Sequence, residues 1–164
     1  MALPSATMHR MADPTLILLA KEIRAKTLKL LDGLTDEQAR YVAPALCNSI
    51  LWHAGHAVML MEHLGIYPLT GSPQTGYPAG WYEKFSWKSD PRTVTAWPSI
   101  EEMRAELTKQ LPRLVNLLES ADEATLSKPD AKGRPMRYLI LHGLHDEALH
   151  SGEIYLLKKM MAGK

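Results

Sequence analysis

Apolar residues recur at helical spacing in four separate stretches of the chain, and the signals for strands are weak. In the first stretch, Asp13 followed by Pro14 is typical of an N-cap and a first helical residue, and an apolar stripe continues to Asp32-Gly33. The second stretch begins near Ser49, ends at Gly65 and is apolar nearly all round. A helix with that pattern lies deep in a bundle, so two long helices are predicted in this part of the chain.

Two further helices are predicted in the rest of the chain. Ser99–Glu102 is a capping box that opens a third long helix, and Pro112 inside it predicts a kink or a split. A polar linker over residues 120–135 follows. Pro135 fits the first position of a last helix that continues to about Met161.

Residues 66–98 connect the second and third helices and contain seven of the eleven aromatic residues. A helix of about 17 residues is only about 26 Å long, so this connection can run back along the whole bundle and leave those two helices parallel. Such a connection can cover a site, act as a simple crossover or form dimer contacts. The predicted fold is an all-α four-helix bundle, with residues 1–164 as one domain.

Composition argues against several classes of partner. The formal net charge is +1 and no block of like charge stands out, so neither nucleic acid nor a charged membrane surface is expected to bind. The apolar stretch Leu16–Ala20 is too short to span a bilayer, and the N-terminus lacks the features of a secretory signal. With Cys47 as the single cysteine, a cytoplasmic domain is expected.

Six of the seven histidines fall in two of the predicted helices: His53, His56 and His63 in the second, and His142, His145 and His150 in the last. Asp146 and His150 are one turn apart, so both side chains can reach one ion. His142 lies a further turn away and can orient a ligand or line the pocket, and Glu153 is a candidate hydrogen-bond acceptor for His150. Taken singly, each histidine also fits an ordinary surface or core position, but together they favour a metal site in the bundle core.

Two motifs resemble those of the DinB-like (damage-inducible) four-helix bundles. Ser49–His56 is similar to the second-helix motif of that family, in which a metal-binding histidine follows the serine by seven residues. His150–Ile154 is similar to the fourth-helix signature, and Leu34–Gln38 and Trp97–Glu102 fit the family as well. The resemblance covers nearly the whole chain. It implies a metal held by three residues, namely His56, Asp146 and His150, while His53 does not occupy a ligand position.

The chain departs from the family pattern at two positions. The family commonly has histidine where this chain has Asp146, and the related mycothiol-dependent maleylpyruvate isomerases have a ligating glutamate there. An aspartate can serve with a shorter reach, or His142 can take its place with a shifted ion. Ser151 replaces an arginine that many relatives carry beside the site.

Three protein ligands leave one to three coordination positions open, which is typical of catalytic metal sites. Two histidines and a carboxylate suit Zn²⁺ and also non-haem Fe(II), while the resemblance implies Zn²⁺ or Ni²⁺ in the purified protein. Because relatives include bacillithiol transferases and mycothiol-dependent isomerases, the resemblance implies a low-molecular-weight thiol as cofactor. We therefore expect a metal-dependent thiol transferase or isomerase that acts on a small-molecule substrate, with an aromatic lid from residues 77–97 that closes on it.

The alternative is a bundle without catalytic activity that acts through dimerisation or partner binding. Family members are often homodimers, so the resemblance implies a homodimer under either interpretation. The aromatic connection over residues 66–98 is then expected to form the dimer interface, with side chains filling the histidine pocket.

Overall fold

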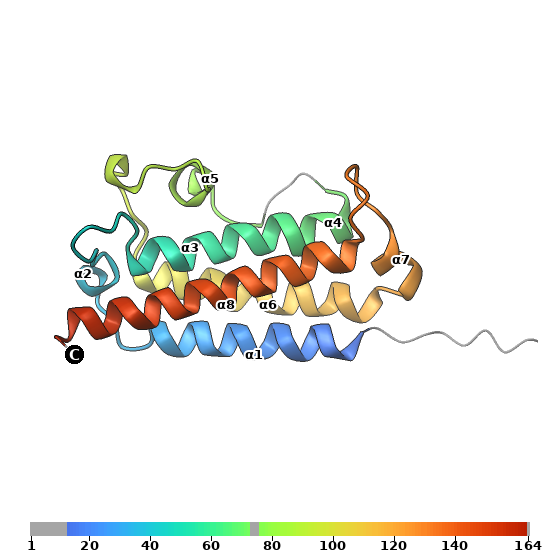
Figure 1. Ribbon diagram of the computed structural model, residues 1–164, viewed down its shortest axis with the longest axis horizontal. Coiled ribbons are helices and arrows are strands. Elements are labelled where there is room, and N and C mark those ends of the chain that lie inside the picture. The colour runs from blue at the N-terminus through green and yellow to red at the C-terminus, as the bar shows by residue number, and fades with distance from the viewer. Residues whose placement is uncertain (1–12, 73–75, 164) are drawn as a thin grey trace, which may run out of the picture.

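The computed structural model describes residues 13–72 and 76–163, and within these ranges the chain is helical with no strand (Figure 1). The long helices are α1 (Pro14–Leu31), α3 (Ile50–Leu60), α6 (Ile100–Ser120) and α8 (Met136–Met161). The short segments are α2 (Asp36–Ala39), the π-helical turn η1 (Met61–Ile66), α4 (Tyr67–Thr70), α5 (Trp81–Phe85), the 3-10 turn η2 (Pro91–Thr93) and α7 (Glu123–Ser127). The prediction of an all-α bundle is confirmed. None of the described helices is long and apolar enough to cross a membrane.

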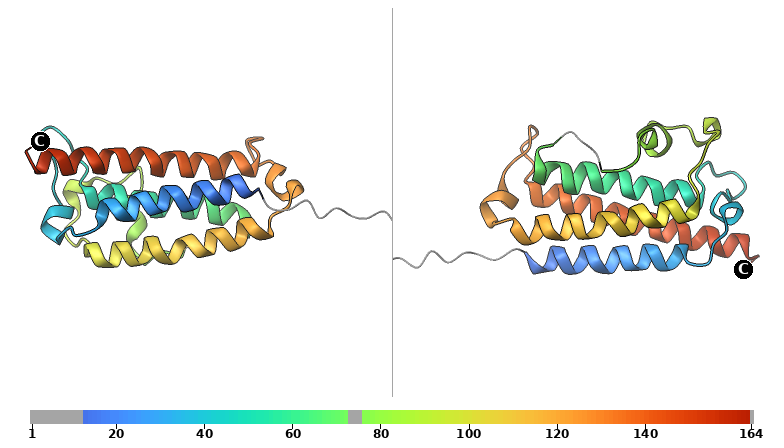
Figure 2. Two further views of the ribbon diagram at one scale, coloured as in Figure 1. Left: turned by 90° about the horizontal axis from the view of Figure 1, so that it is seen from below. Right: turned by 180° about the vertical axis from the view of Figure 1, so that it is seen from behind.

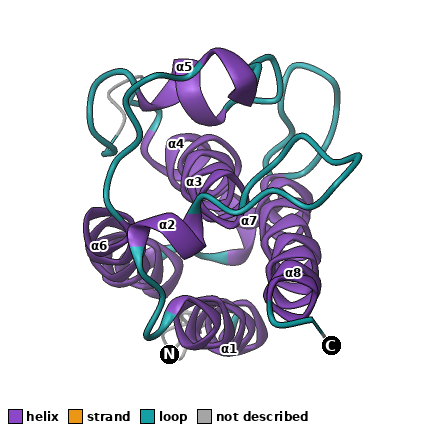
Figure 3. Ribbon diagram, turned by 90° about the vertical axis from the view of Figure 1, so that its left-hand side faces the viewer, coloured by secondary structure: helices purple, strands orange, loops and turns teal. Residues whose placement is uncertain are grey.

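The four long helices pack side by side around a common axis (Figure 3). Helices α1 and α8 run in one direction, and α3 and α6 run in the other, as Figures 1 and 2 show. The predicted parallel arrangement of the second and third long helices is therefore confirmed. The connection between them crosses the outer side of α3, and its helix α5 packs directly on α3.

Most helix ends follow from the capping residues in the sequence. The side chain of Asp13 accepts hydrogen bonds from the first turn of α1, and Thr35 and Ser99 each form a complete capping box. Such a cap is worth about 1 kcal/mol, because it satisfies backbone N–H groups that have no partner within the helix. At the other end of α1, Gly33 has a φ of 70°, a conformation that glycine adopts without strain.

The predicted end of the second long helix at Gly65 is wrong. The helical path continues beyond α3 through η1 and α4, and it ends at Gly71, which has a φ of 64°. Gly65 instead allows close packing, since a Cβ atom there would lie 2.6 Å from the sulfur of Met61. The structure therefore uses this glycine for its small size, and uses Gly71 to end the helix.

Helix α6 is not split at Pro112. Proline removes one hydrogen bond from the helix ladder and leaves the carbonyl four residues earlier without its usual partner. Both Pro112 and Thr108, which carries that carbonyl, are on the exposed side of α6. Water can therefore solvate the freed carbonyl, and the helix continues past the proline.

The core contains two apolar clusters, one towards each end of the bundle. Trp81 and Phe85 of α5 belong to the cluster that surrounds the first half of α3, and Trp97 packs against it. These aromatic residues, expected in a lid, are therefore core residues, because the connection supplies the layer that covers α3. Among the aromatic residues of this connection, Trp87 is 60% exposed and remains at the surface.

A buried polar layer lies between the two apolar clusters. The guanidinium group of Arg24 donates two hydrogen bonds to the Glu147 carboxylate, at 2.7 and 2.9 Å, and one to the carbonyl of Leu107, at 2.6 Å. Gln110 accepts a hydrogen bond from Arg24 and donates to Glu62, which links the layer to all four long helical segments. The helical spacing along α8 favours a flank position for Glu147, whereas its side chain is fully buried.

Candidate metal centre

Three predicted ligands from two antiparallel helices meet in the half of the bundle that contains α5. His56 comes from α3, and Asp146 and His150 come from successive turns of α8. The Oδ2 atom of Asp146 lies 3.2 Å from Nε2 of His150 and 3.9 Å from Nε2 of His56. The three donor atoms all lie within 4.8 Å of one another. The structure thus brings together the residues that the spacing and the resemblance selected.

The Oδ2 atom of Asp146 has an unusual environment. It is buried and has no hydrogen-bond partner. Among the described residues, no other buried side-chain nitrogen or oxygen lacks one. A buried carboxylate oxygen without a partner loses the stabilisation that water gives it, and that cost is large unless a positive charge compensates. The two imidazole nitrogens that face this oxygen are suitable fellow ligands, so a cation between the three atoms would satisfy it.

The backbone of the long connection orients His56. Its Nδ1 atom donates a hydrogen bond to the carbonyl oxygen of Phe85 at 2.5 Å, because a carbonyl can only accept. The ring also stacks on Trp52, with centroids 4.7 Å apart and planes 13° apart. With the proton fixed on Nδ1, the lone pair of Nε2 is directed towards Asp146 and His150, as a metal ligand requires.

A carboxylate orients His150 in the same way. The Nδ1 atom of His150 lies 2.7 Å from Oε2 of Glu153, one turn further along α8. The carboxylate accepts the Nδ1 proton and leaves the Nε2 lone pair for the centre. The prediction that Glu153 is an acceptor for this imidazole is confirmed.

The protonation tendencies of the centre follow from burial and from these carboxylates. Burial lowers the pKa of His56, so its imidazole is held in the neutral form that binds metals. Burial also lowers the pKa of His150, but the neighbouring carboxylates of Asp146 and Glu153 outweigh that effect, and the net pKa is raised. For Asp146, burial raises the pKa while the neighbouring His150 imidazole lowers it, and the net pKa is lowered. A cation and a proton therefore compete for His150.

The spacing of the donor atoms fits a transition metal with few protein ligands. In a tetrahedral site with bonds of about 2.0–2.1 Å, neighbouring ligand atoms are roughly 3.3 Å apart. The two distances from Asp146 are 3.2 and 3.9 Å, so a small movement of His56 would complete such a site. Although aspartate is shorter than glutamate, the Asp146 side chain thus reaches within 3.2 and 3.9 Å of the two imidazole nitrogens.

The structure places three other histidines of the two helices, His63, His142 and His145, away from this group. His142, the alternative third ligand, is exposed and stacks against the ring of Tyr138 with centroids 6.1 Å apart. His145 is exposed as well, and Nε2 of His63 lies 3.0 Å from the hydroxyl of Tyr77. None of these three belongs to a possible metal-binding group among the described residues.

Ser151 faces the buried polar layer rather than the candidate centre. Its hydroxyl lies 2.8 Å from that of Thr27 on α1, and Thr27 also donates a hydrogen bond to Glu147. The residue that replaces the arginine of many relatives is thus part of the contact between α1 and α8.

Two groups close to the centre were not given a role from the sequence. The carbonyl of Phe85 belongs to the backbone, and no residue type signals a backbone acceptor. The Nδ1 atom of His53 lies 2.9 Å from Nδ1 of His150 and 2.9 Å from Oε2 of Glu153. Burial lowers the pKa of His53 to about 4. The spacing of three residues between His53 and His56 was the available signal for this second histidine.

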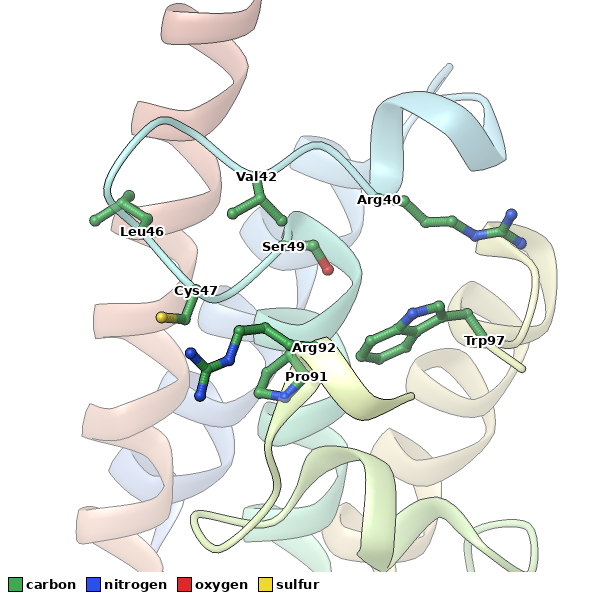
Figure 4. Close-up of a pocket in the computed structure, with 8 residues that line it drawn as sticks. All are labelled: Arg40, Val42, Leu46, Cys47, Ser49, Pro91, Arg92 and Trp97. Carbon is green, nitrogen blue, oxygen red and sulfur yellow. The ribbon is translucent and has the colours of Figure 1, made fainter. Parts of the chain in front are cut away.

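A separate pocket of about 290 Å³ lies at the beginning of α3 (Figure 4). Its lining includes Cys47 and Arg92, which lie near each other, with Trp97 on the opposite side. Cys47 is an exposed free thiol and belongs to neither of the possible metal-binding groups in the described part of the chain. This pocket is therefore distinct from the candidate metal centre.

The fold and the centre together define a class of helical bundle with a histidine–carboxylate group between its second and fourth long helices. The chain belongs to the DinB superfamily, whose sequence model matches residues 19–154. A crystal structure described as the conserved protein of locus from Enterococcus faecalis has a similar fold, with a TM-score of 0.63 and 19% sequence identity. The similarity covers 92% of this chain and 97% of that chain. A search of curated proteins finds no match.

Proposed function

We propose that the protein is a metal-dependent enzyme that uses a low-molecular-weight thiol, as a transferase or an isomerase, with His56, Asp146 and His150 as the metal ligands. The observation that carries this proposal is the buried Oδ2 atom of Asp146, which has no hydrogen-bond partner and faces two imidazole Nε2 atoms. A divalent ion, Zn²⁺ or Ni²⁺ with Fe²⁺ as a further option, fits two nitrogens and one carboxylate oxygen. The thiol chemistry is supported by the resemblance to thiol transferases and thiol-dependent isomerases.

The residues around the ligands have separate roles in this proposal. The Phe85 carbonyl and the Glu153 carboxylate hold the protons on the far nitrogens of the two histidines, so both Nε2 lone pairs stay directed inward. Trp52 stacks on His56 and restricts its ring rotation. When bound, the ion supplies open coordination positions and stabilises the anionic form of a thiol.

Metal analysis of tag-free protein tests the centre first. We expect Asp146→Ala to hold about one ion per chain fewer than the purified wild type, and His150→Ala to hold no stoichiometric metal, because three ligands are needed for tight binding. His145→Ala is the matched control, since this exposed histidine lies on the same helix and outside the group. Equal metal content in wild type and Asp146→Ala would contradict the assignment.

Thiol binding tests the second part of the proposal. Cobalt-substituted protein would be titrated with bacillithiol, mycothiol and free cysteine, and a sulfur-to-cobalt charge-transfer band would report coordination of the thiolate. We expect the band with at least one of the two complex thiols at low concentration, and none in His150→Ala. If the metal-loaded protein showed no band with any thiol, the metal centre would stand but the thiol chemistry would be excluded.

A second candidate function is favoured by exposed apolar side chains on α8. Tyr138, Leu149, Leu156 and Met160 follow one face of this helix by their spacing and are between 41% and 54% exposed, and the exposed His142 and His145 lie on the same face between Tyr138 and Leu149. An apolar stripe of this length is typical of an interaction surface. Two copies of α8 that pair about a two-fold axis would cover each other's stripe, so the occupant we propose is a second copy of the chain. Under this alternative the bundle acts through dimerisation.

Light scattering coupled to gel filtration tests the dimer. Wild type is expected to have the mass of two chains, and Leu149→Glu the mass of one, because a charge in the middle of the stripe opposes its burial. Leu18→Glu is the control, since Leu18 is 67% exposed on α1 and lies outside the stripe. A monomeric wild type at micromolar concentration would contradict the dimer.

A further inference from the structure

A second group of potential metal ligands lies on the other side of the His150 ring. Nδ1 of His53, Nδ1 of His150 and Oε2 of Glu153 form a triangle with sides of 2.9, 2.9 and 2.7 Å. His53 belongs to α3, and the other two residues belong to α8. His53 is buried, while the Glu153 side chain is 53% exposed, so the triangle lies at the edge of the bundle.

This triangle has a different size from the first group of ligands. In a six-coordinate site with bonds of about 2.0–2.1 Å, three ligands on one face are roughly 2.9 Å apart, whereas a tetrahedral site needs roughly 3.3 Å. The sides of the triangle match the six-coordinate value. Two nitrogens and one carboxylate oxygen on one face also form the ligand set that divalent iron and its neighbours prefer.

A cavity adjoins the triangle from the outside. It has a volume of about 250 Å³, and His53 and Glu153 form part of its wall together with Leu46, Leu156 and Leu157. Cys47 and Asn48 also line this cavity. Three protein ligands leave three positions of a six-coordinate ion open, and a cavity of this volume has room for water or a small ligand at those positions.

We propose that His53, His150 and Glu153 form a second cation site, which takes a six-coordinate divalent transition metal such as Ni²⁺ or Fe²⁺. The His150 imidazole then bridges two ions, with Nε2 bound to the ion at His56 and Asp146 and Nδ1 bound to the ion at His53 and Glu153. One proton leaves Nδ1 of His150 for solvent when the second ion binds. The inference goes beyond the proposed thiol chemistry and shares only His150 with its metal centre.

Titration of metal-free protein with Co²⁺ tests the second site, because four-coordinate Co²⁺ absorbs visible light far more strongly than six-coordinate Co²⁺. Wild type is expected to bind two ions per chain, one of each kind. His53→Gln is expected to keep the strongly absorbing ion and lose the weakly absorbing one. Glu153→Gln is expected to lose the weakly absorbing ion and to bind the strongly absorbing one more weakly, because Glu153 also orients His150. Because the Glu153 side chain is half exposed, Glu153→Gln is expected to fold even if His53→Gln, which changes a buried residue, does not. His145→Gln is the control and is expected to bind two ions.

Asp146→Ala separates this inference from the proposed function. It is expected to lose the strongly absorbing ion and to retain the weakly absorbing one. If Asp146→Ala retained both ions, the proposed metal centre would be wrongly assigned, but the assignment of the second site would stand. Loading with Cu²⁺ adds a second readout, since two Cu²⁺ ions bridged by an imidazole are magnetically coupled and lose the signal of isolated Cu²⁺.

Two results would overturn the second site. One is a wild type that binds a single Co²⁺ at saturation, while His53→Gln and Glu153→Gln change only the affinity for that ion. This result would mean that the triangle only orients His150. The other is two ions per chain in wild type and in both glutamine variants, which would place the second ion elsewhere.

Discussion

Alanine in place of Glu147 is expected to lower the free energy of unfolding by about 3–5 kcal/mol, because the substitution leaves the charge of Arg24 buried and unpaired. Arg24 and Glu147 are both fully buried, and their two hydrogen bonds measure 2.7 and 2.9 Å. Arg24 would keep its bonds to the Leu107 carbonyl and Gln110, neither of which carries a charge. Urea unfolding of metal-free protein followed by circular dichroism measures the loss.

The matched control is an exposed ion pair on the same helix as Arg24. Glu22 and Lys26 lie one turn apart on α1, 2.7 Å from each other, with side chains more than half exposed. Glu22→Ala is expected to have little effect on stability, since water solvates the lysine that remains. A similarly small effect of Glu147→Ala would show that water enters the polar layer and solvates Arg24.

A double variant identifies the cause of the loss. Arg24→Met combined with Glu147→Leu removes both charges and fills the space with apolar atoms. The double variant is expected to be more stable than Glu147→Ala, because buried ion pairs cost desolvation energy that an apolar pair does not. If both variants were equally unstable, the loss would come from packing rather than from the unpaired charge.

Much of the fold follows from local signals in the sequence. The helix starts at Asp13, Thr35 and Ser99 follow from side chains that reach backbone groups two or three residues away, so neighbouring residues are sufficient to predict them. The parallel course of α3 and α6 follows from the length of the connection between them. The end of the second helix could not be predicted from local signals. Gly65 allows close packing with Met61, and only the folded helix brings these two residues together.

The candidate ligands are predictable for a different reason. Asp146 and His150 are one turn apart on one helix, and the resemblance selects His56 on another, so the amino-acid sequence is sufficient to select all three candidates, which the structure brings together. The buried polar layer is not predictable in this way. Helical spacing favours a flank position for Glu147, because this residue is rotated about 100° from Asp146 around the helix. Its partner, Arg24, is distant in the sequence, so nothing local indicates that the two charges are buried together.

Alanine in place of Gly55 is expected to affect both stability and metal binding. A Cβ atom at this position would lie 2.3 Å from Cδ1 and 2.5 Å from Cε1 of Phe85, which is fully buried. Overpacking of a core of this kind costs about 1–3 kcal/mol. Because the Phe85 carbonyl holds the Nδ1 proton of His56, displacement of Phe85 is expected to weaken metal binding roughly 10–100-fold. Urea unfolding and competition with a Co²⁺ chelator measure the two effects.

Gly152→Ala is the matched control, because a Cβ atom at that position of α8 would meet nothing within 4 Å. Alanine there is expected to stabilise the helix by about 0.5–1 kcal/mol and to leave the Co²⁺ affinity unchanged. If Gly55→Ala had normal Co²⁺ affinity despite a clear loss of stability, the Phe85 carbonyl would not be needed to orient His56.

The combination of Gly55→Ala with Phe85→Leu separates the side chain of Phe85 from its carbonyl. A leucine is smaller than the ring, so the double variant gives the new methyl group room while keeping the carbonyl at the same place in the chain. We expect Co²⁺ affinity to recover towards the wild-type value, since the carbonyl returns to His56. Stability is expected to recover only in part, because leucine fills less of the core than phenylalanine does. Affinity that stayed low while stability recovered would indicate that the ring of Phe85 itself supports the centre.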